Sequence, residues 1–171
     1  MNGRPWLLLL VAVLAGCVSA RPPAAAHQLP AQGRLFDLSS DPGAGRDSSS
    51  FVAAERYRGK VVVLDFWAGW CGECKRTVPQ ITRLASAFSA DGLVVVGVNA
   101  GERSDDVATY AKELGIGYPI ALDPELAFSD QLGAANLPVL LVVDRTGSVV
   151  HRSRHVDAET LSVIRRLLHP R

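Results

Sequence analysis

Three short stretches of the chain are apolar without alternating polar residues: 61–66 (VVVLDF), 93–98 (LVVVGV) and 139–143 (VLLVV). A strand with one face in water alternates apolar and polar residues, whereas a strand covered by helices on both faces does not. We therefore predict three central strands of a buried sheet. A more mixed stretch at 148–152 is predicted as an edge strand, and 33–39 as a short first strand.

Between these stretches, apolar residues recur at helical spacing. Pro79 falls inside the first helical pattern and is expected to kink it, and Gly115 is expected to end the second helix. A helical turn is also predicted at 51–57. The predicted helices begin at Cys74, after the capping residues Ser104-Asp105-Asp106, after Asp123-Pro124 (ending near Gly133) and after Asp157.

Strands that alternate with helices predict a layered α/β domain. The last two strands are joined by Asp144-Arg145-Thr146-Gly147, a turn sequence suited to a hairpin. Because a hairpin pairs its strands antiparallel, the central sheet is predicted to be mixed and flanked by helices.

Composition excludes some classes of partner. The chain has 171 residues, of which 48% are apolar and 20% are charged, as expected of one globular domain with a core. Its 18 basic and 17 acidic residues give a formal net charge of +1, and no block of like charge stands out. We therefore expect no nucleic-acid partner.

The N-terminus is predicted to be a targeting segment. The apolar run Trp6–Ala15 is too short for a bilayer span, which needs about 20 residues, but it suits the core of a signal peptide. The following Leu14-Ala15-Gly16-Cys17 resembles the bacterial lipobox, which implies a signal peptide at 1–16 and a lipid anchor on Cys17. An ordinary secretory signal with an incidental cysteine is the alternative. Residues 17–32 are rich in proline and alanine and predict a tether, leaving 33–171 as the folded domain.

The chemistry is concentrated at Cys71-Gly72-Glu73-Cys74, where a predicted strand gives way to a helix. Two cysteines three residues apart at such a junction indicate a redox dithiol. The helix N-terminus should lower the pKa of Cys71, the nucleophile, and Cys74 would resolve the mixed disulfide. Half of a four-cysteine zinc site is the alternative, but the only further cysteine is Cys17, so we predict neither a metal site nor a cofactor.

The segment WAGWCGECK at 67–75 resembles the active site of the thioredoxin superfamily, and its surroundings resemble the membrane-anchored TlpA/ResA type of bacterial thiol-disulfide oxidoreductase. The resemblance covers 33–169 and implies a thioredoxin-like fold. It also implies that 116–133 is the extra strand and helix that TlpA/ResA-type proteins carry between the second and third core strands.

The same resemblance assigns further site residues. Asp65 corresponds to the thioredoxin aspartate that accepts the proton of the second cysteine; an ion pair with Lys60 or Lys75 is the alternative. Pro138 corresponds to the cis-proline that faces the dithiol, and the backbone of Leu137 to the group that binds an extended substrate. We expect Trp70 to form an apolar lip beside Cys71, and Trp67 to be core.

Two positions depart from the family pattern. Glu73 stands where the family usually has proline, and Thr77 stands where ResA-type proteins often have a glutamate. A carboxylate beside Cys71 opposes its ionisation, whereas Lys75 favours it. The reduction potential, and with it the direction of electron flow, is therefore left open by the sequence.

The resemblance implies a monomeric, lipid-anchored enzyme of the bacterial cell envelope, facing the periplasm, on either the inner or the outer membrane. It would reduce or exchange disulfides of envelope proteins, such as apocytochrome c or metal-assembly factors, and a membrane thiol transporter would supply electrons for reduction. The alternative is a copper-binding metallochaperone. Such proteins prefer C-x-x-x-C with a downstream histidine, and the spacing here is one residue shorter.

Overall fold

The computed structural model describes residues 27–28, 36–37 and 57–170, with side chains described for 57–170. Within these residues the strands form one sheet in the order β1-β7-β6-β3-β4-β5-β2. The strands are β1 (His27–Gln28), β2 (Phe36–Asp37), β3 (Val61–Trp67), β4 (Leu93–Ala100), β5 (Ile120–Asp123), β6 (Val139–Val143) and β7 (Ser148–Ser153). The helices are α1 (Cys74–Phe88), α2 (Ser104–Leu114), α3 (Ala127–Gln131) and α4 (Ala158–Leu168).

Strand β3 is the centre of the sheet. It pairs in parallel with β4 and antiparallel with β6, and all of its residues are buried. The three strands predicted from apolar runs are therefore the three central strands, and the sheet is mixed as predicted. The hairpin between β6 and β7 closes with a hydrogen bond from the Gly147 N–H to the Asp144 carbonyl.

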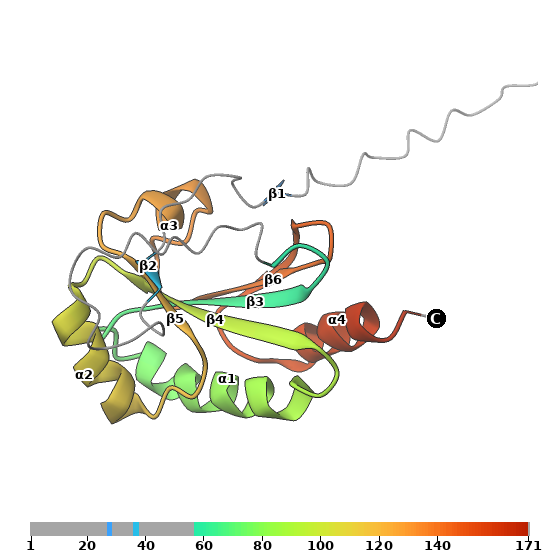
Figure 1. Cartoon of the computed structure of the whole chain (residues 1–171), viewed down its shortest axis with the longest axis horizontal. Coiled ribbons are helices and arrows are strands. Elements are labelled where there is room, and N and C mark those ends of the chain that lie inside the picture. Colours follow the sequence, from blue (N-terminus) through green and yellow to red (C-terminus); the bar gives the residue numbers. More distant parts are fainter. Residues whose placement is uncertain (1–26, 29–35, 38–56, 171) are drawn as a thin grey trace, which may run out of the picture.

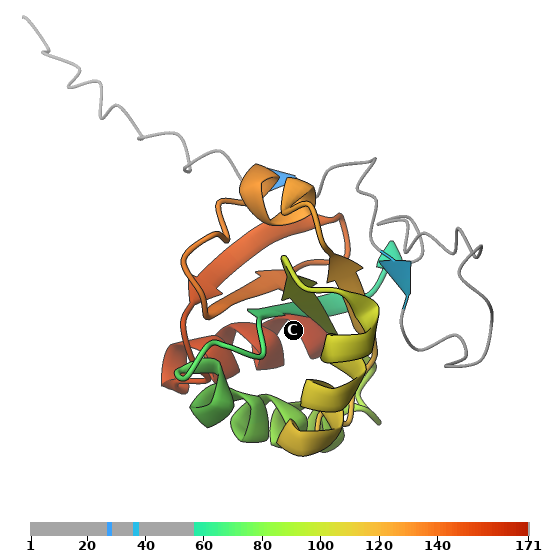
Figure 2. The same cartoon turned by 90° about the vertical axis from the view of Figure 1, so that its left-hand side faces the viewer.

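Helices cover the two faces of the sheet unequally (Figures 1 and 2). Helices α1 and α4, with α2 beside them, lie on one face, and the short α3 lies on the other. Side chains alternate accordingly along β3: Val63 packs with residues of α1 and α4, whereas Phe66 stacks on Phe128 of α3 at 6.0 Å between ring centroids. Asp65 shares its parity with Val63, so it lies on the face that α1 covers.

Both outer edges of the sheet carry a two-residue strand. The short strand predicted within 33–39 is β2, which pairs with β5. Strand β7, predicted as an edge, is flanked by β1, so His27 and Gln28 of the predicted tether pair with it. The predicted signal peptide at 1–16, the predicted lipidation site Cys17 and most of the predicted helical turn at 51–57 lie outside the described residues.

The helix boundaries agree with the prediction except at two N-termini. Helix α1 continues through Pro79, and α2 ends at Gly115 in the left-handed conformation, with φ at 65°. In α2, however, the N-cap is Arg103 and Ser104 is already helical. Asp123, predicted as an N-cap, is the last residue of β5, and α3 begins four residues later.

The reason for the second difference is that Asp123 caps α3 from a distance. Its buried carboxylate accepts hydrogen bonds from the N–H groups of Phe128 and Ser129 at 3.2 and 2.7 Å. These N–H groups have no partner within so short a helix, so the capping residue need not be its sequence neighbour. In α4, by contrast, Asp157 is the predicted N-cap and accepts from the Thr160 N–H at 2.7 Å.

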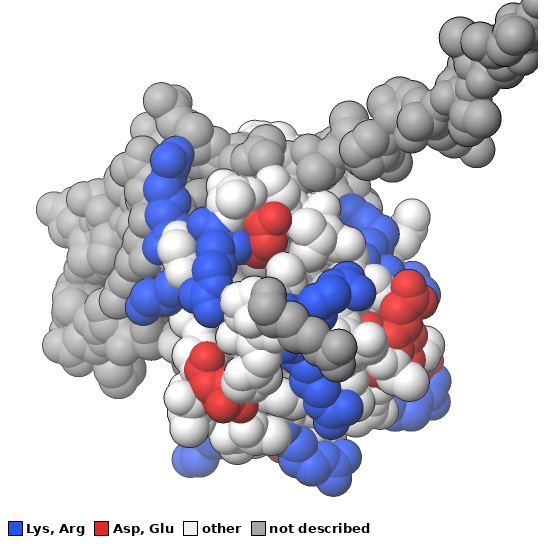
Figure 3. All heavy atoms as spheres, turned by 90° about the vertical axis from the view of Figure 1, so that its right-hand side faces the viewer, with Lys and Arg blue, Asp and Glu red and all other residues white. Residues whose placement is uncertain are grey.

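One face of the described surface is of mixed charge. On the face at the C-terminal end of α4, basic and acidic side chains are interspersed (Figure 3). None of the helices in the described part of the chain combines the length and apolar composition that crossing a membrane requires.

Candidate active site

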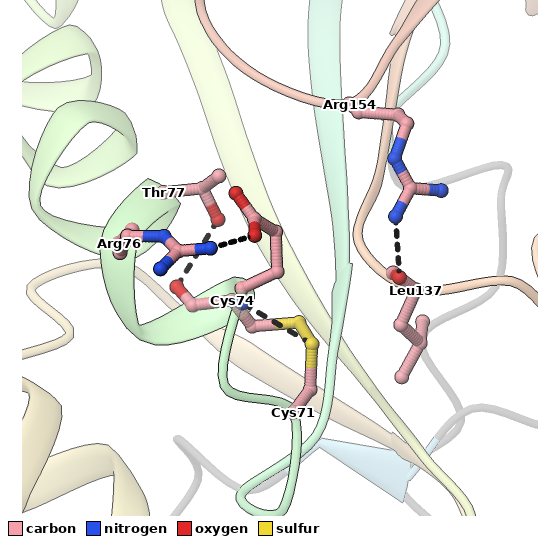
Figure 4. Close-up of polar contacts among 7 residues, drawn as sticks. Cys71, Cys74, Arg76, Thr77, Leu137 and Arg154 are labelled. Atoms are coloured by element: carbon pink, nitrogen blue, oxygen red, sulfur yellow. Dashed lines mark hydrogen bonds and ion pairs between the residues drawn. A yellow bond between two sulfur atoms is a disulfide. The ribbon is translucent and has the colours of Figure 1, made fainter.

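The two cysteines of the C-x-x-C segment are joined by a disulfide. The sulfurs of Cys71 and Cys74 are 2.07 Å apart, and their Cα atoms are 5.3 Å apart. Cys71 lies in the turn that follows β3, and Cys74 is the first residue of α1. The buried strand thus ends directly at the site, and the helix begins there (Figure 4). The sequence prediction of a dithiol at a strand-to-helix junction is confirmed in its placement.

The two cysteines differ less in solvent exposure than the sequence predicts. Cys74 is fully buried, as predicted, whereas Cys71 is 5% exposed instead of openly exposed. Both belong to an apolar cluster with Trp67, Val107 and Ile120. The preceding residue, Trp70, is 69% exposed, so a large apolar side chain faces solvent one position before Cys71.

The helix N-terminus acts on Cys71 through a specific donor. The backbone N–H of Cys74 donates to the Cys71 Sγ at 3.2 Å. In the oxidised protein this sulfur is part of a disulfide, and it stands in the position of the thiolate that reduction would produce. An N–H at the start of a helix, unpaired within the helix, stabilises an anion there. The geometry therefore favours the thiolate form of Cys71.

Asp65 is buried on the α1 face of the sheet, with 1% of its surface exposed. Its Oδ2 accepts a 2.6 Å hydrogen bond from the Tyr118 hydroxyl, and its Oδ1 has no partner among the described residues. Burial raises the pKa of Asp65 to about 7, although the Tyr118 hydrogen bond lowers it. The alternative ion pair with Lys60 or Lys75 is not formed, because both lysines are exposed and the carboxylate is enclosed.

A glycine on the neighbouring strand makes room for the tyrosine. Gly97 of β4 is in register with Asp65. A Cβ at Gly97 would lie 3.1 Å from the Tyr118 ring and 3.0 Å from the Trp67 indole nitrogen. Because glycine has no side chain, the Tyr118 ring can extend over β4 and reach the carboxylate.

The turn before Cys71 is fixed by Glu102, which follows β4. One carboxylate oxygen, Oε2, accepts from the Gly69 N–H at 2.8 Å and from the Asn99 side chain at 2.6 Å. Gly69 is also covered by Tyr110 of α2, whose ring carbon would lie 2.0 Å from a Cβ at position 69. These contacts hold the turn that carries Cys71 against the segment after β4 and against α2.

The loop before β6 borders the dithiol. The Leu137–Pro138 peptide bond is cis, as the sequence predicted, and Leu137 packs against the cluster that contains Cys71 and Cys74. Arg154, which follows β7, donates from Nη1 to the Asn136 carbonyl at 3.0 Å. It also donates from Nη2 to the Leu137 carbonyl at 2.8 Å (Figure 4).

The two positions that depart from the family pattern have different surroundings. Glu73 is exposed and forms an ion pair with Arg76, which lies one turn further along α1. The Arg76 hydrogen bond, aided by the charges of Arg76, Arg154 and His155, holds the pKa of Glu73 below its usual value. Thr77 is buried, and its hydroxyl donates to the Cys74 carbonyl at 3.1 Å. Thr77 therefore supplies no acid or base near the dithiol.

Sequence reasoning missed Tyr118, Glu102 and Arg154. Each acts on a residue far away in the chain, with 53, 33 and 17 positions separating the partners Tyr118–Asp65, Glu102–Gly69 and Arg154–Leu137. No local pattern marks such pairs, because they depend on strand order and register. Within the described residues, no group of three or more His, Cys, Asp or Glu is arranged to hold a metal ion.

Comparison with known proteins agrees with this geometry. The Redoxin family matches residues 24–168. "Thiol-disulfide oxidoreductase ResA" of Geobacillus thermodenitrificans is 33% identical over 93 residues, 54% of this chain and 53% of that protein. The Bacillus subtilis protein of the same name is 32% identical over 115 residues, 62% of this chain and 64% of that protein. The chain thus spans about half to two thirds of the length of these curated relatives.

Among solved structures, a thiol:disulfide interchange protein from Bacteroides sp. superposes with a TM-score of 0.70 and 21% identity. The superposition covers 86% of this chain and 93% of that chain. At this identity the likeness concerns the fold, and it confirms the predicted thioredoxin-like arrangement of the sheet and helices.

Proposed function

Because the chain belongs to the Redoxin family, we propose that it is a thiol-disulfide oxidoreductase that exchanges disulfides of other proteins through Cys71 and Cys74. The observation that carries this proposal is the Cys71–Cys74 disulfide at the start of α1, in one apolar cluster with Leu137 of the cis-proline loop. Exposed Trp70 and the Leu137–Pro138 segment supply the surface on which a substrate polypeptide binds.

In the first step, the reduced protein attacks a substrate disulfide. The Cys71 thiolate forms a bond to one substrate sulfur, the substrate S–S bond breaks, and the other substrate sulfur leaves as a thiolate. Cys71 is the attacking residue because its sulfur accepts the Cys74 N–H and because Cys74 is fully enclosed. The product is a mixed disulfide between Cys71 and the substrate.

In the second step, Cys74 resolves the mixed disulfide. Its thiol must first lose a proton, and Asp65 is the acceptor: a pKa of about 7 leaves a substantial fraction ionised at neutral pH. The Cys74 thiolate then attacks the Cys71 sulfur, the Cys71–substrate bond breaks, and the second substrate thiolate leaves. Two electrons have passed from the dithiol to the substrate, and the Cys71–Cys74 disulfide has formed. The reverse sequence oxidises a substrate dithiol.

The proposed setting is the bacterial cell envelope, with the domain tethered to a membrane through lipidated Cys17. The lipobox-like Leu14-Ala15-Gly16-Cys17 supports this anchor. In that setting the substrates are envelope proteins with cysteine pairs, such as apocytochrome c or metal-assembly factors, and net reduction draws electrons from a membrane thiol transporter.

Trapping of mixed disulfides tests the catalytic proposal. The Cys74→Ser variant cannot resolve, so substrate proteins should accumulate as adducts on Cys71, to be released by reductant and identified by mass spectrometry. The double variant with Cys71→Ser as well should trap none. Adducts that form on Cys74 in a Cys71→Ser protein, and not on Cys71 in the Cys74→Ser protein, would reverse the assigned roles.

Fractionation tests the anchor separately. The full chain expressed in a bacterium should partition with membranes and carry a lipid-modified Cys17 by mass spectrometry. Cys17→Ser should release it from the membrane fraction while the purified protein keeps its exchange activity. A wild-type chain whose mature form begins elsewhere and carries no lipid would refute the anchor and leave the dithiol chemistry intact.

A further inference from the structure

Arg154 is hydrogen-bonded to the loop that precedes the cis-proline. Its two terminal nitrogens donate to two consecutive carbonyls, those of Asn136 and Leu137, immediately before the cis-proline. Figure 4 shows the bond to Leu137. The guanidinium is exposed, yet its direction is fixed by this pair of hydrogen bonds. Leu137 in turn packs against the cluster that contains Cys71 and Cys74. The Arg154 guanidinium is therefore hydrogen-bonded to the loop that borders the Cys71 sulfur.

The charge of Arg154 is not neutralised by its partners. Backbone carbonyls accept hydrogen bonds but carry no net charge, and no carboxylate within the described part of the chain forms an ion pair with Arg154. Arg76, the other arginine at this edge, is paired with Glu73. A guanidinium has five N–H donors, and the two carbonyls occupy only part of them. Arg154 can therefore still donate to a further acceptor.

The fixed guanidinium and the exposed Trp70 identify a class of substrate. We infer that Arg154 makes the site select polypeptides in which a carboxylate side chain lies next to the cysteine that reacts with Cys71, an inference that rests on the proposed function. Planar guanidinium groups match carboxylates in geometry, and this one is already oriented by the loop, so little conformational entropy is lost on binding.

The neighbouring charges favour the same preference. Glu73 lies close enough to Arg154 to sense it electrostatically, but its own charge is balanced by Arg76. Lys75 is exposed at the start of α1 and adds positive charge, whereas the neighbouring His155 is paired with Asp157 at 4.0 Å and adds none on balance. A substrate carboxylate that approaches Cys71 therefore meets a net positive edge, whereas a lysine at the same position is repelled.

Exchange with matched peptides tests this inference. Three disulfide-cyclised peptides differ only in the residue beside the reactive cysteine, which is Glu, Gln or Lys, and the rate of their reduction by the reduced protein is measured. Exposed charge pairs are weak, so we expect the Glu peptide to react about two- to five-fold faster than the Gln peptide and the Lys peptide to be slowest. The preference should shrink at high salt because ions screen exposed charges.

Variants distinguish recognition of a substrate carboxylate by Arg154 from a purely structural role of Arg154 in the loop before the cis-proline. Arg154→Gln should bring the Glu-to-Gln rate ratio close to one, whereas a purely structural role would slow all three peptides equally and leave the ratio unchanged. Arg166→Gln removes the same charge from an exposed position on α4 and should leave the ratio as in wild type. Equal rates for the Glu and Gln peptides with wild-type protein would overturn the inference alone. Failure to reduce any of the peptides would overturn the proposed function together with it.

Discussion

The Tyr118 hydroxyl donates a 2.6 Å hydrogen bond to the Asp65 carboxylate, although 53 residues separate the two in the chain. Tyr118 lies in the segment that leads into β5, and Asp65 lies in the central strand β3. Between them is the glycine of β4 in register with Asp65, where a side chain would meet the tyrosine ring. The segment that enters β5 thus supplies the partner of the buried acid.

Removing this hydroxyl should raise the pKa of Asp65 further. The hydrogen bond favours the ionised carboxylate, and burial opposes it. A hydrogen bond to a charged group contributes about 1.5–3 kcal/mol, which corresponds to a rise of about 1 to 2 pH units on Tyr118→Phe. A carbon-detected NMR titration of the Asp65 carboxyl in the oxidised protein measures it directly. Resolution by Cys74 should shift to higher pH by a similar amount.

Tyr110→Phe is the matched control for Tyr118→Phe. The Tyr110 ring covers Gly69, in the turn before Cys71. The hydrogen bond that lowers the pKa of Asp65 comes from Tyr118, so the Tyr110 variant removes a hydroxyl near the site without touching that bond. The Asp65 titration should be unchanged in this variant. An unchanged titration in Tyr118→Phe as well would show that the hydroxyl does not tune the acid.

The buried acid should also make stability depend on pH. The pKa of Asp65 rises from 3.8 to about 7 on folding, so the folded state binds a proton that the unfolded chain releases between these values. Stability attributable to this group is therefore highest below pH 3.8 and decreases until about pH 7, by about 4 kcal/mol at 1.36 kcal/mol per pH unit. Asp65→Asn removes this dependence. Its free energy of unfolding relative to oxidised wild type, measured in urea, should increase from pH 4 to 7 and then level off.

Asp144→Asn is a useful comparison because the sign is opposite. Although burial opposes ionisation of Asp144, hydrogen bonds from Thr146, Ser148 and Gly147 keep its pKa below the usual value. The ionised form therefore stabilises the fold at neutral pH, and this contribution is lost as the pH falls into the acid range.

For Asp65, the contradicting result is a difference in free energy of unfolding between Asp65→Asn and wild type that is the same at pH 4 and pH 8. That result would refute the argument that burial raises the pKa of Asp65.

The central sheet could be predicted from the sequence because burial on both faces leaves its own pattern. The strands β3, β4 and β6 can be predicted from their apolar runs without knowing which elements pack beside them. The end of α2 can be predicted in the same way from its glycine. The same pattern made Asp65 conspicuous, because a carboxylate interrupts a run that must be buried. Its environment was therefore predictable in kind: it is enclosed, and its pKa is raised.

The partners of these residues could not be predicted, because they are set by the arrangement of elements. Tyr118 reaches Asp65 only because β5 lies beside β4 and position 97 is glycine. Arg154 reaches the carbonyl of Leu137 only because β7 pairs with β6 and ends beside the loop that precedes it. The low exposure of Cys71 likewise follows from tertiary packing around the turn. None of these contacts has a local signature.

Two glycines near the dithiol should differ in their tolerance of alanine. A Cβ at Gly69 would lie 2.0 Å from the Tyr110 ring, whereas a Cβ at Gly72 has no atom within 4 Å. Gly69→Ala should therefore destabilise the protein by about 1–3 kcal/mol or more through overpacking, and Gly72→Ala should stay within about 0.5 kcal/mol of wild type. Urea unfolding of the oxidised proteins measures both. Equal stability of the two variants would show that the turn can shift away from Tyr110.

The charge of Glu73 should set part of the reduction potential. Its ion pair with Arg76 holds the pKa of Glu73 below the usual value, so the carboxylate is ionised at neutral pH, between the two cysteines in sequence. A nearby anion disfavours the Cys71 thiolate, and the thiolate stabilises the reduced form. Glu73→Gln removes the anion and releases the Arg76 cation. Both changes favour the thiolate, so the potential should become more positive by about 10 mV or more, and the pKa of Cys71 should fall.

Arg76→Gln makes the opposite change at the same pair. It leaves the Glu73 carboxylate without its principal partner, which disfavours the Cys71 thiolate and should move the potential to more negative values. Equilibration with glutathione redox buffers measures the potential of each variant, and pH-dependent alkylation of Cys71 measures its pKa. If both variants move the potential in the same direction, the pair acts through the structure of the first turn of α1 and not through charge. Opposite shifts would make Glu73, where the family usually has proline, a determinant of whether this dithiol donates or accepts electrons.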